Sequence, residues 1–314
     1  MPRLKPRFRK LLIRWLLYWS SVIVLRTAAE LPQWLSNWLV SRMALLGYYV
    51  FKTNRNIALS NLRLAFKENL SRQERRRLAN RMFLNFGCSL AEFISMPMWG
   101  RKRIIECVEG EKYLNLIRKY RIKGKGIIIA GGHIGNWELF AAYTAAHFPL
   151  SVVARRLYFK PFDKEIVNRR RKLGINVIYQ EDGIKPILKA LRRGHVVGIL
   201  VDQDIKGVSS DFVDFFGVPA STPSAHAALS LTTGAPMIAA GLVRKSPPNQ
   251  FEILAEGPIE IKRTANKTAD RITLVAKWSK TFESFIKKYP NQWAWFHPRW
   301  KTRPPDEINK ADKS

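Results

Sequence analysis

A histidine and a glutamate five positions apart stand in the stretch from Gly126 to Phe140, which reads GIIIAGGHIGNWELF. The apolar run from Ile127 to Ala130 is typical of a buried strand, and His133 follows inside a glycine turn. Asn136 is a favourable N-cap residue for a helix that begins after it. The pattern therefore predicts His133 just beyond the C-terminal end of a strand and Glu138 in the first turn of the next helix. Ligands bind at such strand ends in open α/β sheets.

The spacing of His133 and Glu138 allows a catalytic pair only if the turn separates them. On one continuous helix, side chains five positions apart point in different directions. Across a turn they can face each other, and a carboxylate then fixes the imidazole tautomer and stabilises the imidazolium. Such a histidine can act as a general base toward a hydroxyl nucleophile. Two other interpretations remain: a glycine-packed strand–helix joint with a surface histidine, or a phosphate turn, although no GxGxxG or Walker sequence occurs.

The charge of the 314-residue chain is extreme. Lys and Arg number 54 against 24 acidic residues, which gives a net charge of +30. This charge indicates an anionic partner: nucleic acid, an anionic membrane surface or a phosphorylated substrate. The 10 Trp and 9 Tyr residues suit a membrane interface. Cys88 and Cys107 show no metal-binding spacing, and we expect buried thiols in a reducing compartment.

Residues 1–52 are predicted to form a basic N-terminus and a hydrophobic membrane anchor. The apolar segment from Leu11 to Leu25 is interrupted by Arg14 and is shorter than the ~20 residues of a spanning helix. A second segment, Trp34 to Phe51, continues the pattern, and we expect both to anchor in or lie on the bilayer. The alternative is a pair of core helices in a soluble bundle. A single span with basic residues inside would export the rest of the chain, whereas reduced cysteines favour a cytoplasmic domain. We therefore favour an interfacial or incompletely inserted anchor.

Residues 53–304 are predicted to form one α/β domain, followed by a polar tail, 305–314. A helical lead-in, 53–124, precedes a core, 125–304, in which apolar runs alternate with helical patterns. This alternation predicts a mostly parallel central sheet with helices on both faces. The expected strands are 126–130, 151–154, 176–179, 196–201, 236–243 and 251–255. The expected helices are 136–147, 162–173, 184–193, 223–233 and 265–289, and Ser71 to Glu74 is a predicted capping box.

Five stretches in order along the chain carry a family resemblance. They are Arg55 with Asn61-Leu62-Arg63-Leu64-Ala65-Phe66; His133 with Glu138; Arg155-Arg156 with Pro161, Asn168 and Arg171; Asp202-Gln203-Asp204 with Phe215-Phe216-Gly217 and Thr222; and the segment from Gln292 to Pro304. From about residue 55 to 304, the chain resembles the bacterial late acyltransferases of lipid A biosynthesis. This lauroyl/myristoyl transferase group belongs to the wider glycerolipid acyltransferase superfamily.

The resemblance implies an acyl transfer without a cofactor or metal. A fatty acyl chain would move from acyl carrier protein to a hydroxyl of a lipid A precursor, similar to Kdo2-lipid IVA. The reaction would take place on the cytoplasmic side of the anionic bacterial inner membrane. His133 would be the general base and Glu138 its orienting partner. Backbone N–H groups of the turn around Gly132 are the expected oxyanion donors.

Other residues are assigned supporting roles by the same resemblance. Arg171 would bind a phosphate, because a guanidinium fork fits phosphate oxygens. Without the resemblance, its run of four basic residues is typical of a solvated helix face. Asp202, just past a strand end, would orient either Arg171 or a backbone turn. Arg155 and Arg156 could both match the arginine of the second block, and the spacing to Pro161 favours Arg156. Asp202 and Asp204 could also form a metal pair, but we expect no metal.

Three rival functions differ in partner or class. A lysophospholipid or another lipid could be the acceptor, since the sequence identifies neither the acceptor nor the acyl-chain length. A nucleic-acid-binding protein would explain the charge, but no binding motif of that kind occurs and the N-terminus is apolar. A membrane scaffold that lost activity is disfavoured by the intact His133 and Glu138. We expect no nucleic-acid partner, and the sequence leaves the oligomeric state open.

Overall fold

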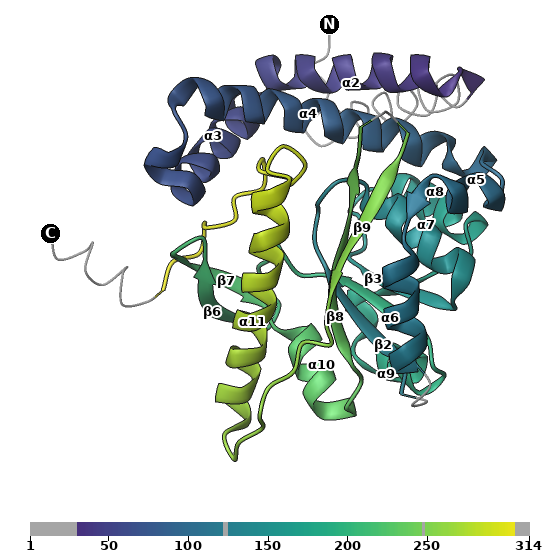
Figure 1. Cartoon of the computed structure of the whole chain (residues 1–314), viewed down its shortest axis with the longest axis vertical. Helices are drawn as coiled ribbons and strands as arrows, with labels where there is room; N and C mark the ends of the chain where they lie inside the picture. The colour runs from purple at the N-terminus through teal and green to yellow at the C-terminus, as the bar shows by residue number, and fades with distance from the viewer. Residues whose placement is uncertain (1–29, 122–124, 247–248, 305–314) are drawn as a thin grey trace, which may run out of the picture.

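A seven-stranded sheet forms the centre of the molecule in the computed structural model, which describes residues 30–121, 125–246 and 249–304 (Figure 1). The strand order is β1-β9-β8-β2-β5-β3-β4, and within this sheet only the β8–β9 pair is antiparallel. The prediction of a mostly parallel sheet is therefore confirmed. The strands are β1 (Val108–Glu109), β2 (Ile127–Gly131), β3 (Leu150–Ala154), β4 (Ile175–Tyr179), β5 (Val196–Leu200), β8 (Met237–Arg244) and β9 (Phe251–Glu256).

The order of the central strands determines which chain segments meet. β2 lies between β5 and β8, and all five of its residues are buried. A parallel strand covered on both faces reads as a continuous apolar run, which is why the sequence located it. Gly131 at the end of β2 pairs with Leu200 at the end of β5. The turns that follow these two strands therefore leave the sheet side by side.

A β-hairpin outside the main sheet was not predicted. It consists of β6 (Ser210–Phe215) and β7 (Val218–Pro223), which pair in antiparallel register. Phe216 and Gly217 form its two-residue turn, both with positive φ, as the tightest hairpin turns require. The residues of β6 are alternately exposed and buried, so one face of this strand is packed, whereas the last four residues of β7 are all buried.

Helices cover both faces of the sheet and divide its apolar side chains between two cores. One core includes residues of α9, α10 and α11, and the other includes residues of α5, α6 and α7. The helices of this domain are α5 (Arg101–Glu106), α6 (Glu111–Arg121), α7 (Trp137–His147), α8 (Lys160–Lys172), α9 (Lys185–Arg192), α10 (Ala225–Thr233) and α11 (Lys267–Lys288). The predicted arrangement of helices on both faces is thus confirmed.

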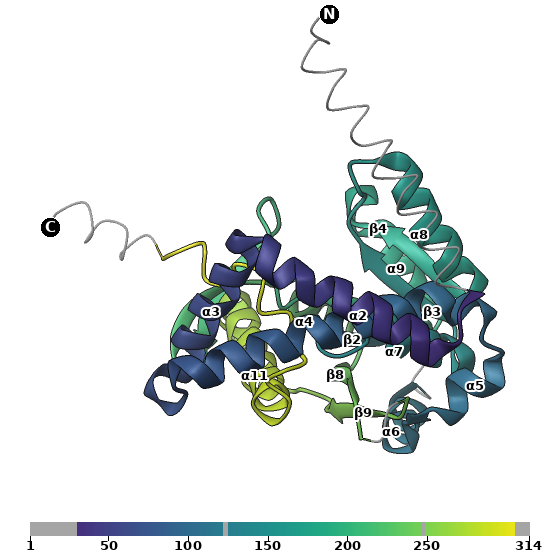
Figure 2. The same ribbon diagram turned by 90° about the horizontal axis from the view of Figure 1, so that it is seen from above.

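Three further helices form a layer along one end of the domain, seen from above in Figure 2. They are α2 (Gln33–Val50), α3 (Lys52–Phe66) and α4 (Arg72–Ser95), and a short 3-10 turn, η1 (Lys67–Asn69), follows α3. The predicted capping box begins α4: Ser71 Oγ accepts from Glu74 N, and Glu74 accepts from Ser71 N. Two more such turns are η2 (Met96–Met98) and η3 (Gln180–Asp182).

The predicted anchor corresponds only in part to described residues. Its first segment, Leu11 to Leu25, lies outside them, and its second segment, Trp34 to Phe51, is α2. α2 lies against α4 so closely that a Cβ added to Gly87 would be 2.5 Å from Ser41 Cα. Among the helices in the described ranges, none is both long enough and apolar enough to cross a bilayer.

Candidate active site

The glycine turn between β2 and α7 brings His133 to the carboxyl edge of the sheet. Gly135 has φ of +56°, and a Cβ at this position would lie 1.9 Å from Leu242 O, so only glycine fits there. Asn136 is the N-cap of α7, as predicted, and its Oδ1 accepts from Leu139 N at 2.9 Å. Its Nδ2 donates to the buried Glu92 at 2.7 Å. The turn is therefore held at both ends.

Asp202, from the turn after β5, is the carboxylate that contacts His133. His133 Nδ1 lies 2.8 Å from Asp202 Oδ1, and His133 N donates to Asp202 Oδ2 at 2.7 Å. Trp293 Nε1 donates to the same Oδ2 at 2.7 Å. Asp202 is therefore oriented by three donors. Two roles were predicted for Asp202, and the contacts show that it holds a backbone turn and not Arg171.

The environment of Asp202 favours its charged form. Burial alone would raise the pKa of Asp202, but the charge of His133 and the hydrogen bonds from His133 and Trp293 outweigh it and lower the pKa. An ionised Asp202 keeps the proton of the neutral imidazole on Nδ1, which leaves the lone pair on Nε2. The His133 side chain is 23% exposed, and no partner of Nε2 is found among the described residues. This nitrogen can therefore accept a proton from a ligand.

Gly132 is required for the approach of Asp202 to the turn. A Cβ at this position would lie 2.4 Å from Phe282 Cζ and 2.8 Å from Asp202 Cγ. Neither group could remain in place beside a larger residue. The predicted supporting role of Gly132 thus has a steric basis in the packing of α11 and Asp202 against the turn.

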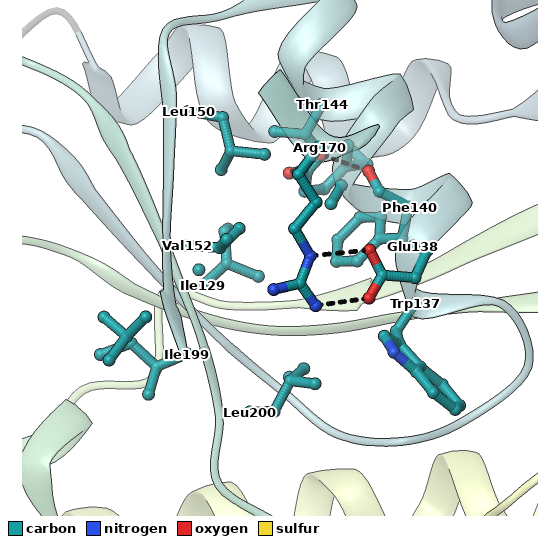
Figure 3. A pocket seen from close by; sticks show the side chains of 15 residues that line it. Ile129, Trp137, Glu138, Phe140, Thr144, Leu150, Val152, Arg170, Ile199 and Leu200 are labelled. Carbon is teal, nitrogen blue, oxygen red and sulfur yellow. Dashed lines mark hydrogen bonds and ion pairs between the residues drawn. The ribbon is translucent and has the colours of Figure 1, made fainter. Parts of the chain in front are cut away.

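Glu138 occupies the predicted first turn of α7, but its carboxylate faces Arg170 rather than His133. Arg170 Nη2 lies 2.6 Å from Glu138 Oε1, and Arg170 Nε lies 3.1 Å from Oε2 (Figure 3). The expectation that Glu138 orients the imidazole is therefore not matched by the contacts. The physical reason is that β5 lies next to β2, so the acid after β5 reaches Nδ1 while α7 directs Glu138 toward α8.

Arg171 and Arg156 lie apart from this pair. Arg171 is exposed, and its recorded contact is to Asn168 Oδ1 at 3.5 Å. Arg156 is also exposed, pairs with Asp182 at 3.3 Å and covers the Tyr179 ring at 3.8 Å. The structure thus places neither predicted arginine against His133.

Arg170 was not predicted because it stands in a run of four basic residues, and the run itself does not show which side chain points into the protein. Its spacing from Ile166, Val167 and the buried Asp163 is that of one helix face, and this signal could have identified it. Burial lowers the pKa of Arg170, but the charge and hydrogen bonds of Glu138 outweigh it and raise the pKa. Arg170 therefore stays charged inside a largely apolar environment.

An apolar pocket lies between α7 and the strands β2, β3 and β5 (Figure 3). The Glu138–Arg170 ion pair contributes its charged groups. Trp137 lines this pocket and also a small hollow that includes His133, and the two rings lie 5.0 Å apart. The apolar lining of the pocket between α7 and the strands includes Ile129, Phe140, Leu150, Val152, Ile199 and Leu200. The pocket therefore suits a hydrocarbon chain whose reactive end reaches the imidazole.

Most backbone N–H groups in the glycine turn are already bonded. The N–H groups of His133, Ile134 and Gly135 donate to Asp202, Gly132 O and Gln292 O. These three groups are thus engaged, and the expected oxyanion donors of this turn are largely excluded. The first turn of α7 differs, because no acceptor of the Trp137 and Glu138 N–H groups is found among the described residues.

His226, another histidine that could act as a base, and Asp204, one of the possible metal ligands, have different surroundings. His226 is fully buried beside Trp278, and burial lowers its pKa to about 3. Asp204 accepts from Thr302 N and Thr302 Oγ1 at 2.7 and 3.0 Å. In the part of the chain that the structure describes, no group of three or more His, Cys, Asp or Glu residues is arranged to hold a metal ion.

These features define an α/β domain in which a histidine–aspartate pair lies beside an apolar pocket. The comparison with protein families gives the class: the family described as "Bacterial lipid A biosynthesis acyltransferase" matches residues 1–302. The chain belongs to this family and is an acyltransferase. The family suggested by the five sequence stretches is therefore confirmed.

Two lipid A acyltransferases match the chain over nearly their whole length, and a third relative matches about half of it. The lipid A biosynthesis lauroyltransferase of Escherichia coli (strain K12) is 28% identical over 309 residues, which cover 95% of this chain and 96% of the relative. The lipid A biosynthesis palmitoleoyltransferase of the same organism is 25% identical over 301 residues, 94% of each chain. A phosphatidylinositol mannoside acyltransferase of Mycobacterium tuberculosis (strain CDC 1551 / Oshkosh) is 25% identical over 56% of this chain and 55% of its own length.

Proposed function

We propose that the protein transfers a fatty acyl chain from acyl carrier protein to a hydroxyl of a phosphorylated lipid A precursor. The observation that carries this proposal is the 2.8 Å contact between His133 Nδ1 and Asp202 Oδ1, beside the apolar pocket. The names of the relatives support lipid A as the acceptor class. The reaction would take place at the cytoplasmic face of the bacterial inner membrane.

The proposed chemistry is general-base catalysis by His133. The acceptor hydroxyl gives its proton to His133 Nε2 while its oxygen attacks the thioester carbonyl. The carbonyl oxygen becomes an oxyanion, and Asp202 stabilises the imidazolium. When the carbonyl re-forms, the carbon–sulfur bond breaks and the imidazolium returns the proton to the thiol of the carrier. The products are an ester and the free carrier thiol, and no other reactant is required.

The oxyanion would be stabilised by the N-terminal end of α7. The N–H groups of Trp137 and Glu138 point out of the first helical turn, where the helix dipole favours negative charge. Trp137 also lines the hollow that includes His133, so the beginning of α7 borders this hollow. Donors aimed at a developing charge typically account for a rate factor of about 10² to 10³.

The acyl chain would lie in the pocket between α7 and the sheet. Burial of each methylene group contributes about 0.8 kcal/mol, so an apolar lining can bind acyl methylene groups without polar anchors. Glu138 and Arg170 neutralise each other there, which allows both charges to border an apolar ligand. Exposed arginines such as Arg156 and Arg171 would attract the acidic carrier protein or phosphate groups.

The experiment is a transfer assay in detergent micelles with the full chain. Acyl carrier proteins loaded with chains of several lengths are supplied with a tetra-acylated, phosphorylated lipid A precursor and a competing lysophospholipid. Mass spectrometry should detect one added chain on the precursor and a clear preference for one chain length. Addition only to the lysophospholipid would reject the acceptor but keep the chemistry. Full activity of His133→Ala would reject the mechanism.

A further inference from the structure

An arginine-rich hollow opens where the end of α2 meets α3 and the beginning of α4. Tyr48 and Tyr49 of α2 form one wall, and Asn80 of α4 lies at another side. Among the described residues, no acidic side chain lines the hollow. It is separate from the hollow that contains His133. The five arginines that line it are Arg55, Arg63, Arg72, Arg75 and Arg76.

The charges of this arginine hollow are not neutralised within the part of the chain that the structure describes. Among the ion pairs of the described residues, none involves any of the five arginines. Arg75 donates to two backbone carbonyls, Lys67 O and Leu70 O, which are uncharged. The neighbouring acid, Glu74, accepts from the backbone of Ser71 in the capping box.

The position of three of these arginines is unfavourable without an anion. Arg72, Arg75 and Arg76 lie in the first turns of α4, where the helix dipole repels positive charge. Arg63 and Arg55 add like charges from α3. A bound phosphate would relieve this repulsion, and guanidinium groups bind phosphate oxygens with two parallel hydrogen bonds. Asn80, also on α4, has a buried amide oxygen with no hydrogen-bond partner among the described residues, and a hydroxyl of the ligand could satisfy it.

The outward face of α2 continues from this hollow and is apolar. Every exposed residue of α2 is apolar or aromatic except Arg42. Trp34 is 68% exposed and Leu46 is 61% exposed, on the outermost helix of the layer in Figures 1 and 2. Tyr49 belongs to both surfaces, since it lines the hollow and is 55% exposed. An aromatic apolar face bordered by arginines is typical of a helix that lies in a membrane interface.

We propose that the arginine hollow binds the phosphate of an anionic lipid headgroup while the outward face of α2 lies in the same bilayer surface. The hollow is thus a lipid-phosphate site outside the catalytic centre. It would set the depth and orientation of the enzyme on the membrane. The inference does not depend on acyl transfer, so either proposal can fail alone.

The test measures partition of the full chain onto vesicles of phosphatidylcholine, with and without phosphatidylglycerol. The variant Arg63→Gln/Arg72→Gln/Arg76→Gln removes three exposed charges with no recorded protein partner. The control, Lys189→Gln/Arg192→Gln/Arg193→Gln, removes three exposed charges from α9 and its C-cap, at the other end of the domain (Figure 1). The N-terminal residues are common to all three proteins. Their contribution therefore cancels when the anionic-to-neutral binding ratio of one protein is divided by that of another.

The hollow variant should lose about 100-fold of the preference for anionic vesicles, because each basic residue at such a surface contributes about 1 kcal/mol. The control should stay within about threefold, because salt screens charges beyond roughly 8 Å. The hollow variant should also melt at a higher temperature than the unmodified protein, since the repulsion is removed. A hollow variant that loses its preference for anionic vesicles but melts at a higher temperature is folded, so its weaker binding is not caused by misfolding.

Two outcomes would overturn the proposal. One is an unchanged preference for anionic vesicles in the hollow variant. The other combines two results: the unmodified protein binds purified acyl carrier protein in the absence of vesicles, and the hollow variant loses this binding but keeps its preference for anionic vesicles. That result would assign the hollow to an acidic protein. A further variant, Trp34→Gln/Leu46→Gln, should weaken binding to both vesicle types, and unaltered binding would remove α2 from the contact.

Discussion

His133 and Asp202 are 69 positions apart in the chain and are joined by two hydrogen bonds, one to the imidazole and one to the backbone N–H. The parallel pairing of β2 with β5 causes this contact, because both residues follow the carboxyl ends of these strands. Glu138, only five positions from His133, is held by Arg170 instead. The two acids therefore have separate tasks, one at the imidazole and one beside the apolar pocket.

Glu138→Gln should weaken the fold and the pocket more than the chemistry. The side chains of Glu138 and Arg170 are 14% and 19% exposed, so the variant leaves a poorly solvated cation. We expect a loss of about 2 kcal/mol in the free energy of unfolding, below the roughly 3–5 kcal/mol of a fully buried pair. Denaturant unfolding measures this loss. Glu138→Gln/Arg170→Met should recover most of it, and an equal or larger loss in the double variant would contradict the account.

Gly132→Ala should displace Asp202 and lower both stability and activity. The added methyl group would lie 2.4 Å from Phe282 Cζ, and overpacking of this kind costs about 1–3 kcal/mol. Gly100→Ala is the control, because no atom lies within 4 Å of a Cβ at that position. Thermal unfolding and transfer rate are the measurements. A Gly132→Ala protein as stable and active as the control would show that the tight packing is dispensable.

The buried His226 should make the fold sensitive to mild acid. Burial lowers its pKa from 6.5 to about 3, so between these values the unfolded chain binds a proton that the folded chain excludes. Stability must therefore decrease as the pH falls from 6.5 toward 3, by at most about 1.4 kcal/mol per pH unit. His226→Leu should remove this part of the pH dependence. The measurement is the free energy of unfolding of both proteins from about pH 7.5 to about pH 5, the upper part of this window; parallel curves would refute the prediction.

The sequence predicted the elements of the sheet more completely than the contacts between them. β2 and β5 are continuous apolar runs, so their positions were visible. Their adjacency was not visible, because β5 enters the sheet between β2 and β3 and no local pattern encodes that order. Asp202 was correctly expected at the cleft, but its contact with His133 required the strand order. The β6–β7 hairpin was missed because burial in β6 does not follow residue type: Asp211 is buried, whereas the neighbouring Phe212 is 37% exposed.

The arginines show a similar limit. Arg171 and Arg170 are adjacent, and a change of one position on a helix rotates the side chain from the pocket to solvent. The resemblance selected Arg171, whereas the packing of α8 directs Arg170 to Glu138. Helix periodicity counted from Asp163 would have favoured Arg170. Sequence motifs therefore located the arginine cluster, and only the fold identified the inward member.

The most direct test of the account compares the transfer rates of Asp202→Asn and Glu138→Gln at saturating donor and acceptor. Asp202→Asn keeps the shape of the side chain but removes the charge that stabilises the imidazolium, so we predict a decrease of roughly 10³- to 10⁴-fold. The control is Asp204→Asn, which alters a carboxylate that binds Thr302 and not His133. Glu138→Gln should retain a transfer rate within about tenfold of the unmodified enzyme. If Asp202→Asn stays within about tenfold of the unmodified enzyme while Glu138→Gln is inactive, Asp202 is not the partner of the catalytic base.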